Sequence, residues 1–315
     1  MTADRIITVT HTLGERIVVA SGDVELLTYV YAPDPHPAEV RKPYIHPLRT
    51  LAGSLVSGYR PSGHRWHKGL QMTAGLVAEQ NFSGAHPCRE PESGRAEERV
   101  GSMRHDGFSH FEVAEDRLRF VERLTWVENG GQEWAAERRT IELHSVDRKE
   151  GVWALDWSLH LINMRDEPLR FGSATTAGGE PAGCTGLNWR GPRDFAGGDV
   201  FGPGVLGGEG QTGAAQLTGV PASEAPWVVF TAEHDETDAQ STLLFHHAPE
   251  NEDAVHSSHW HVSSEPIPSV ALSWAFLDAF RLPPGESFGY RYRVVVADGA
   301  WDRDRAEAYL DSHQW

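Results

Sequence analysis

The sequence lacks several features that define common protein classes. Only two cysteines, Cys88 and Cys184, occur among 315 residues, which excludes a disulfide framework of the secreted kind. No apolar run reaches the ~18 residues of a membrane-spanning helix, so we expect no membrane span. Basic residues are few: 28 Lys and Arg stand against 45 Asp and Glu, a formal net charge of −17. This balance argues against nucleic acid as a partner, because phosphate binding needs a basic surface.

The N-terminal stretch MTADRIITVTHTLGERIVV lacks the basic and apolar regions of a secretory signal peptide. With both cysteines expected to be free thiols, this predicts a cytoplasmic protein. No internal repeat or clear linker divides the chain, so we expect residues 1–315 to form a single domain. An all-β domain can reach this length and bury a large core.

Common catalytic sequence motifs are also missing. The chain contains no phosphate-binding loop G-x-x-x-x-G-K-[ST] and no nucleophile elbow G-x-S-x-G. It contains neither C-x-x-C nor H-E-x-x-H. Nucleotide-dependent chemistry is therefore not expected. We expect no organic cofactor, whereas a divalent metal stays open.

Apolar residues recur instead at every second position, the period of a β-strand with one buried face. Residues 153–161 (WALDWSLHL) and 288–296 (FGYRYRVVV) alternate in this way. Residues 118–126 (LRFVERLTW) follow the same register, with the polar Glu122 as an exception. These runs predict half-buried strands.

Turn sequences separate the predicted strands. ENGGQ lies between residues 117–128 and 133–146, which we expect to form a hairpin. Helical periodicity is confined to the C-terminus, where Asp302 or Asp304 could cap a short helix. We therefore predict an all-β fold, a large antiparallel β-sandwich with a short C-terminal helix.

Two stretches have the composition of loops. Residues 86–98 are polar and rich in turn formers, and residues 190–215 are rich in glycine. A glycine-rich segment of that length inside a compact domain is typical of a functional or mobile loop.

Histidine is frequent, with 17 in the chain, and several cluster. GHRWHKGLQ at 63–71 holds His64 and His67 in a predicted loop or turn before a strand. HWHV holds His259 and His261, whose side chains would share one face of a strand. Together with distant histidines these could bind zinc, iron or manganese, or transfer protons without metal. They could equally be hydrogen-bonded pocket or surface groups.

Tryptophan and arginine also occur together, in GLNWRGPRDF, which includes Trp189, Arg190 and Arg193. An indole can stack on the apolar face of a sugar while arginine binds its hydroxyl groups. The other interpretation is a core tryptophan beside two solvated arginines.

The ordered set KPYIHPLRT, GHRWHKGL, NF at 81–82, WAAERRTIEL, AGCTGLNWRGPRDF, FHHAPEN, HWHV and PPGESFGYRYRVVV resembles a bacterial family labelled methane oxygenase PmoA. The resemblance covers nearly the whole chain, although the membrane spans of a particulate methane monooxygenase subunit are missing. It implies a β-sandwich similar to galactose mutarotase-like proteins and a carbohydrate substrate. His259 falls outside the usual pattern. Cys184 and Thr185 stand where a family tyrosine is expected.

We therefore predict a carbohydrate-active enzyme that uses histidine and carboxylate acid–base chemistry, of the epimerase, lyase or hydrolase type. One alternative is a metal-dependent enzyme with His46, His64, His67 and His261 as ligands. The other is a non-catalytic carbohydrate-binding protein. The predicted catalytic residues are His64, His67, His247, His261 and Glu180, with His67 and His261 favoured for proton transfer. The predicted substrate-binding residues are His46, Asn81, Trp189, Arg190, Asn251 and Trp260.

Overall fold

The structure is a computed structural model that describes residues 6–36, 39–84, 100–179, 183, 185–203, 219–254 and 256–315. Several features singled out in the sequence lie outside the described residues. They are the loop 86–98, the part of the glycine-rich stretch beyond residue 203, Glu180, Cys88 and Cys184.

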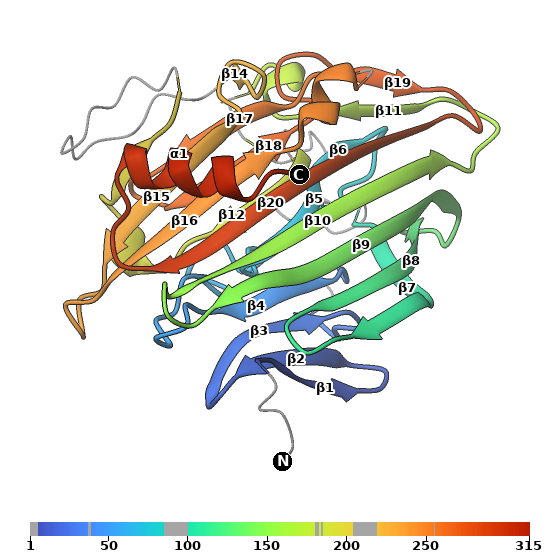
Figure 1. Cartoon of the computed structure of the whole chain (residues 1–315). Coiled ribbons are helices and arrows are strands. Elements are labelled where there is room, and N and C mark those ends of the chain that lie inside the picture. Colours follow the sequence, from blue (N-terminus) through green and yellow to red (C-terminus); the bar gives the residue numbers. More distant parts are fainter. Residues whose placement is uncertain are drawn as a thin grey trace.

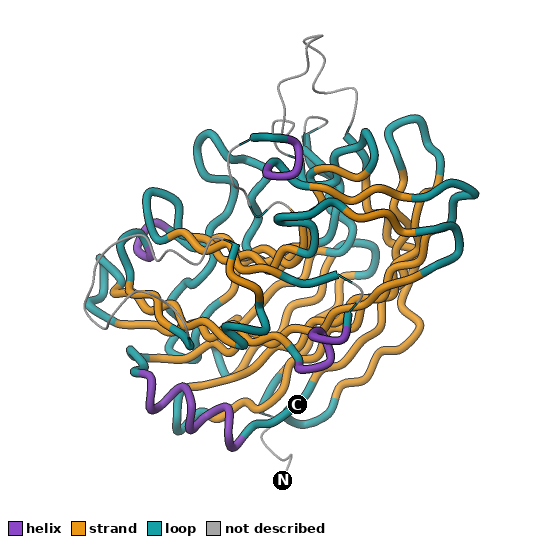
Figure 2. Tube along the Cα trace, turned by 90° about the horizontal axis from the view of Figure 1, so that it is seen from above, coloured by secondary structure: helices purple, strands orange, loops and turns teal. Residues whose placement is uncertain are grey.

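Two large sheets pack face to face, and all described pairs of neighbouring strands are antiparallel (Figures 1 and 2). This is the predicted antiparallel β-sandwich. The first sheet has nine strands, in the spatial order β1 (Thr8–Thr12), β2 (Arg16–Ser21), β3 (Val24–Val30), β4 (Tyr44–Leu48), β5 (Leu70–Ala74), β12 (Thr185–Arg190), β18 (Ser269–Ser273), β17 (His259–Ser263) and β14 (Val220–Pro221).

The second sheet has eight strands and a small third sheet has three. The eight-stranded order is β13 (Asp199–Phe201), β15 (Trp227–Glu233), β16 (Gln240–His247), β20 (Ser287–Asp298), β10 (Val152–Asn163), β9 (Glu133–Asp147), β8 (Leu118–Val127) and β7 (Ser102–Val113). The small sheet is ordered β19 (Phe280–Leu282), β11 (Leu169–Gly172) and β6 (Leu76–Val77). The described residues also include the short 3-10 helices η2 (Thr175–Ala177), η3 (Arg193–Phe195) and η4 (Pro249–Asp253).

The sequence periodicity correctly assigns the core-facing side of the longest strands. Trp153, Trp157 and Leu161 of β10 are fully buried between the sheets. The expected hairpin is also present, because β8 pairs with β9 along its whole length. Burial of these alternating apolar side chains is the main driving force for the sandwich.

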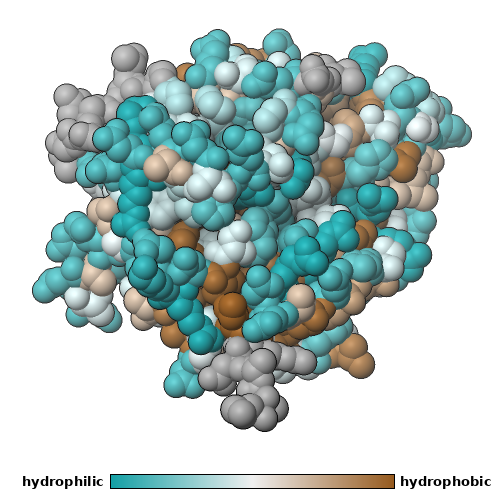
Figure 3. Space-filling model, in the orientation of Figure 1, coloured by the Kyte–Doolittle hydropathy of each residue, from teal (hydrophilic) through white to brown (hydrophobic). Residues whose placement is uncertain are grey.

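The single α-helix of the described chain, α1 (Arg303–Ser312), lies across the outer face of the eight-stranded sheet (Figure 1). Its Ala306 and Tyr309 pack with Val295 in a second, smaller apolar cluster. Asp302 caps it, because its Oδ1 accepts a hydrogen bond from the Arg305 backbone N–H at 2.8 Å. The face that carries this helix is largely hydrophilic, with hydrophobic side chains gathered in its lower part (Figure 3). None of the described helices has the length and apolar character to cross a membrane.

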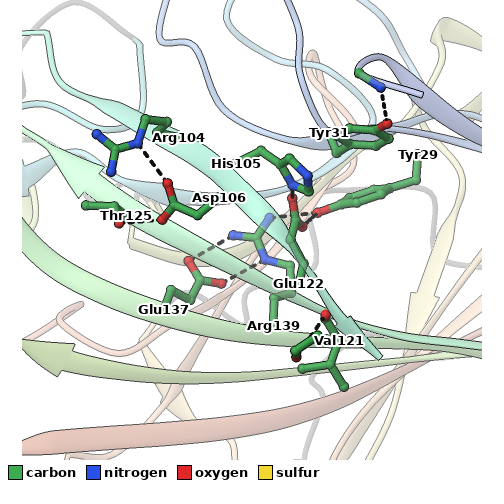
Figure 4. Close-up of polar contacts among 12 residues, drawn as sticks. Tyr29, Tyr31, Arg104, His105, Asp106, Val121, Glu122, Thr125, Glu137 and Arg139 are labelled. Atoms are coloured by element: carbon green, nitrogen blue, oxygen red, sulfur yellow. Dashed lines mark hydrogen bonds and ion pairs between the residues drawn. The ribbon is translucent and has the colours of Figure 1, made fainter. Parts of the chain in front are cut away.

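A buried network of charged groups joins the two sheets (Figure 4). The Arg139 guanidinium donates to both oxygens of Glu137, at 2.7 and 2.9 Å, and to the Tyr29 hydroxyl at 3.3 Å. The Tyr29 hydroxyl donates to Glu122, and His105 Nδ1 lies 2.6 Å from the same carboxylate. Glu122, the exception in its strand pattern, is therefore a core residue whose carboxylate contacts two polar partners, Tyr29 and His105.

Candidate functional site

The nine-stranded sheet has one side in the core and a second, polar side. Leu187 and Trp189 of β12 lie in the core, so Asn188 and Arg190 point to the other side. On β5 the same alternation places Gln71 on that side. A strand with both sides buried normally reads as a continuous apolar run, so polar residues at alternate buried positions are unusual.

Strand pairing brings these polar residues into one row. Asn188 is paired with Gln71 on one flank and with Ala271 on the other, and Ala271 is paired with His261. Gln71 and His261 lie three strand spacings apart, a distance of about 14 Å. Arg190 lies two residues along β12 from Asn188 and therefore on the same side. Gly183 packs on this side of the sheet, because a Cβ added to it would lie 2.7 Å from the Ala271 Cβ and 2.8 Å from the His261 Cβ.

A tight turn places His67 over the start of β5. The His67 backbone N–H donates to the His64 carbonyl at 3.0 Å, and the His67 carbonyl accepts from the Arg60 N–H at 2.8 Å. The turn is tied to the sheet, because Gln71 Nε2 donates to the Trp66 carbonyl at 3.1 Å. The structure therefore confirms that GHRWHKGLQ is a turn leading into a strand.

We name the set Gln71, Asn188, Arg190, His67 and His261 the polar face. Each member carries at least one buried polar atom without a hydrogen-bond partner within the described chain. These atoms are Gln71 Oε1, Asn188 Oδ1, Arg190 Nε and Nη1, His67 Nδ1 and His261 Nδ1. Buried polar atoms are nearly always hydrogen-bonded, since leaving one unsatisfied costs about 1–3 kcal/mol. Because they lie on one side of one sheet, this face is the candidate site for a polar ligand.

The protonation states within the polar face follow from burial and from neighbouring cations. Burial, with the charges of Arg190, His64 and Lys42, lowers the pKa of His67 to about 3. Burial alone lowers the pKa of His261. Burial also lowers the pKa of Arg190 to about 10, so its guanidinium keeps its charge at pH 7. At neutral pH the polar face thus holds one cation and two neutral imidazoles.

The low histidine pKa values predict an acid-labile fold. His67 and His246 each have a folded pKa of about 3, whereas histidine in the unfolded chain titrates near 6.5. Below pH 6.5 the unfolded chain binds more protons, so the free energy of unfolding falls as pH drops towards 4. Each histidine can lower the free energy of unfolding by at most about 1.4 kcal/mol per pH unit. Urea titrations at pH 7, 6 and 5 measure this slope.

Substituting His67 by Gln should reduce the slope of that stability profile, because one of the titrating groups is gone. The same substitution at the exposed His110 is the matched control. Equal slopes for wild type and H67Q between pH 7 and 5 would contradict the pKa assignment.

Two more of the predicted histidines lie beside the polar face. The His64 ring centroid is 5.5 Å from that of His67. His46 of β4 stacks on Tyr59 at 4.8 Å, and its Nδ1 lies 2.8 Å from Ser57 Oγ. Burial lowers the pKa of His46 to about 4, with Arg49 adding to the effect.

Trp189 and Trp260 lie on the opposite, core-facing side of their strands. Both indoles are fully buried, and their N–H groups donate to the carbonyls of Val56 and Ala225 at 2.8 and 2.6 Å. No ligand on the polar face can stack on either ring. These tryptophans instead anchor the strands that carry Arg190 and His261.

The other described site candidates hold backbone in place. His247 lies on the core-facing side of β16, with its ring nitrogens 3.0 and 2.6 Å from the carbonyl oxygens of Ala248 and Ala222. Asn251 binds the backbone N–H and carbonyl of Arg291. Asn81 accepts from two backbone N–H groups in a turn. None of the three lies on β5, β12 or β17, the strands that carry Gln71, Asn188, Arg190 and His261.

Gln71 and Asn188 belong to the polar face but were not among the predicted site residues. A signal was present in LQMTA and TGLNWR, where a single amide alternates with large apolar residues. The alternation alone shows that both amides lie on the opposite side of their strands from the large apolar residues. It does not show that this side is buried.

The described residues provide no set of metal ligands. Among them, no three or more His, Cys, Asp or Glu side chains are grouped so that they could hold a metal ion. His259 and His261 share a strand face as expected, and both rings lie near Phe276. The metal-dependent alternative therefore has no ligand set in this part of the chain.

The fold is an antiparallel β-sandwich, and one of its sheets carries buried polar residues on the side away from the core. The chain belongs to the Family of unknown function (DUF6807), which it matches over residues 16–311. A search of curated proteins finds no match.

Several solved structures are similar to this chain at low sequence identity. An α-galactosidase from Geobacillus stearothermophilus in complex with stachyose has 15% identity and a TM-score of 0.42, over 97% of this chain and 42% of that one. Galactose 1-epimerase from Lactobacillus acidophilus NCFM has 10% identity and a TM-score of 0.34, over 93% and 98% of the two chains. The chain thus spans about two fifths of the α-galactosidase. Likenesses this weak do not carry an activity across.

Proposed function

We propose that this protein is a carbohydrate-active enzyme that transfers protons on a sugar bound at the polar face. The observation that carries the proposal is the convergence of unsatisfied amide, guanidinium and imidazole atoms on β5, β12 and β17. A sugar presents several hydroxyl groups that both donate and accept hydrogen bonds. Such a ligand can satisfy the oxygens of Gln71 and Asn188 and the N–H groups of Arg190 together.

His67 and His261 are the proposed proton-transfer groups. Each is neutral at pH 7 and therefore has one ring nitrogen that accepts a proton and one that donates. One imidazole would remove a proton from carbon or hydroxyl, and the other would return one, as epimerisation, β-elimination or glycoside cleavage requires. Glu180 remains a predicted partner. The resemblance to the PmoA-labelled family points to the same substrate class.

Proton NMR in D2O tests the proposal directly. Wild-type protein is incubated with a panel of aldoses, keto-sugars, uronates and glycosides, and the spectra report anomer exchange, deuterium uptake at carbon and product release. We expect at least one of these changes, and we expect it to be lost in a His67→Gln, His261→Gln double variant. Saturable binding without any turnover across the panel would instead establish a carbohydrate-binding protein.

A further inference from the structure

Arg190 differs from the other buried arginines of the described chain. Arg139 and Arg293 are each held by a carboxylate at two points, Glu137 at 2.7 and 2.9 Å and Asp156 at 2.6 and 2.9 Å. Arg190 is 6% exposed, yet within the described residues its guanidinium forms no ion pair, and its Nε and Nη1 have no hydrogen-bond partner. Burying an unpaired charge costs several kcal/mol, so a folded protein keeps one only where something else compensates.

The position of Arg190 is fixed by the backbone around it. Its N–H donates to the Gly69 carbonyl at 2.9 Å, and its carbonyl accepts from the Gly58 N–H at 2.8 Å. Gly58 packs so closely that an added Cβ would lie 3.3 Å from Arg190 Cγ. The backbone and the first part of the Arg190 side chain are therefore held in place before any ligand arrives.

The strands around Arg190 carry no negative charge, although the protein carries a net charge of −17. On β5, β12, β17 and β18 no residue is acidic. A second buried basic residue, Lys42, donates to the Ser83 carbonyl at 3.0 Å and forms no ion pair with a described residue, and burial lowers its pKa well below the usual value. Both basic groups lower the pKa of His67, which places each of them within electrostatic range of that imidazole. This local field favours an anion.

We propose that the sugar bound at the polar face carries a carboxylate, as in a uronate or an aldonate, and that Arg190 forms an ion pair with it. This rests on the proposed function and narrows its substrate class. Arginine is suited to the task because its planar fork matches a carboxylate. The amides of Gln71 and Asn188 remain free for the hydroxyl groups of the same ligand.

Binding of the carboxylate would also change His67. It neutralises the Arg190 charge, which is one of the causes that lower the pKa of that imidazole. His67 therefore becomes a stronger base when an acidic sugar is bound. A neutral sugar at the same site would leave it weakly basic.

Isothermal titration calorimetry with the full chain tests this inference. Glucuronate, galacturonate, mannuronate and gluconate are compared with glucose, galactose and mannose, and glucose 6-phosphate is added as a second anion. We expect one acidic sugar to bind about 10–100-fold more tightly than its neutral parent, the range of a charge-assisted hydrogen bond. No preference for any acid, or tighter binding of the phosphate, would overturn the carboxylate assignment.

Arg190→Met should abolish the preference, so that the acidic sugar binds no more tightly than its neutral parent. The exposed Arg193→Met, three residues away, is the matched control and should behave as wild type. Without ligand, R190M should match or exceed the wild-type melting temperature, because an uncompensated charge is removed. A preference that survives in a folded R190M would overturn the role of Arg190.

Failure of this inference is distinguishable from failure of the proposed function. Equal binding of acidic and neutral sugars with turnover that depends on His67 would refute only the carboxylate. Absence of binding and turnover for every sugar in both experiments would refute both.

Discussion

His67→Gln lowers kcat by about 10²–10⁴-fold, the usual contribution of a positioned acid–base group, once a substrate is identified. Glutamine keeps hydrogen-bonding capacity at this position but cannot accept and return a proton at neutral pH. The backbone bonds that close the turn, from the Arg60 N–H to the His67 carbonyl and from the His67 N–H to the His64 carbonyl, are unaffected. The loss should therefore appear in kcat with little change in folding.

Steady-state kinetics and a thermal melt on the same samples separate catalysis from structure. The exposed His110→Gln variant is the control and should retain wild-type values for both. A folded H67Q that keeps more than half of the wild-type kcat would remove His67 from the mechanism. A variant with a lower melting temperature and unchanged kcat would show that the side chain is structural.

The second large effect concerns the buried charge network rather than the site. Arg139→Leu should lower the free energy of unfolding by about 3–5 kcal/mol, because Glu137 and Glu122 are then left in the core without their cation. Both carboxylates are almost fully buried, at 2% and 0% exposure, so water cannot replace the lost partner. Urea unfolding monitored by tryptophan fluorescence measures the change.

Arg138→Leu is the matched control for that variant. Arg138 is adjacent in sequence but exposed, and we expect a change within about 0.5 kcal/mol. Adding Glu137→Leu to Arg139→Leu should restore part of the lost stability, because the stranded carboxylate is removed as well. A cost below about 1 kcal/mol for R139L would show that the network contributes little.

Much of the strand architecture could be predicted from the sequence. The alternation in 153–161 and 288–296 identifies the buried side of β10 and β20, and ENGGQ marks the hairpin between β8 and β9. Asp302 marks the start of α1. These are local signals, since side-chain direction in a strand and capping at a helix end depend on residues a few positions apart.

Glu122 shows where the local pattern was incomplete. It interrupts the apolar register of its strand, yet it lies in the core because Tyr29 of the opposite sheet and His105 of the neighbouring strand satisfy its carboxylate. Neither partner is near it in sequence. The same limit applies to Trp189 and Trp260. An indole is suited to stacking on a sugar ring, but the positions of these two residues on their strands direct them into the core.

By itself, the sequence determined the all-β class, the long strands, the turn around His64 and His67 and the C-terminal helix. Only the tertiary structure decided that Gln71, Asn188 and His261 form one row and that Arg190 lies beside it without an acidic partner among the described residues. The reason is that strand pairing joins distant segments: Thr73 bonds Gly186, 113 positions away. Period two fixes the side of a strand on which a residue lies, but pairing between distant strands fixes its neighbours.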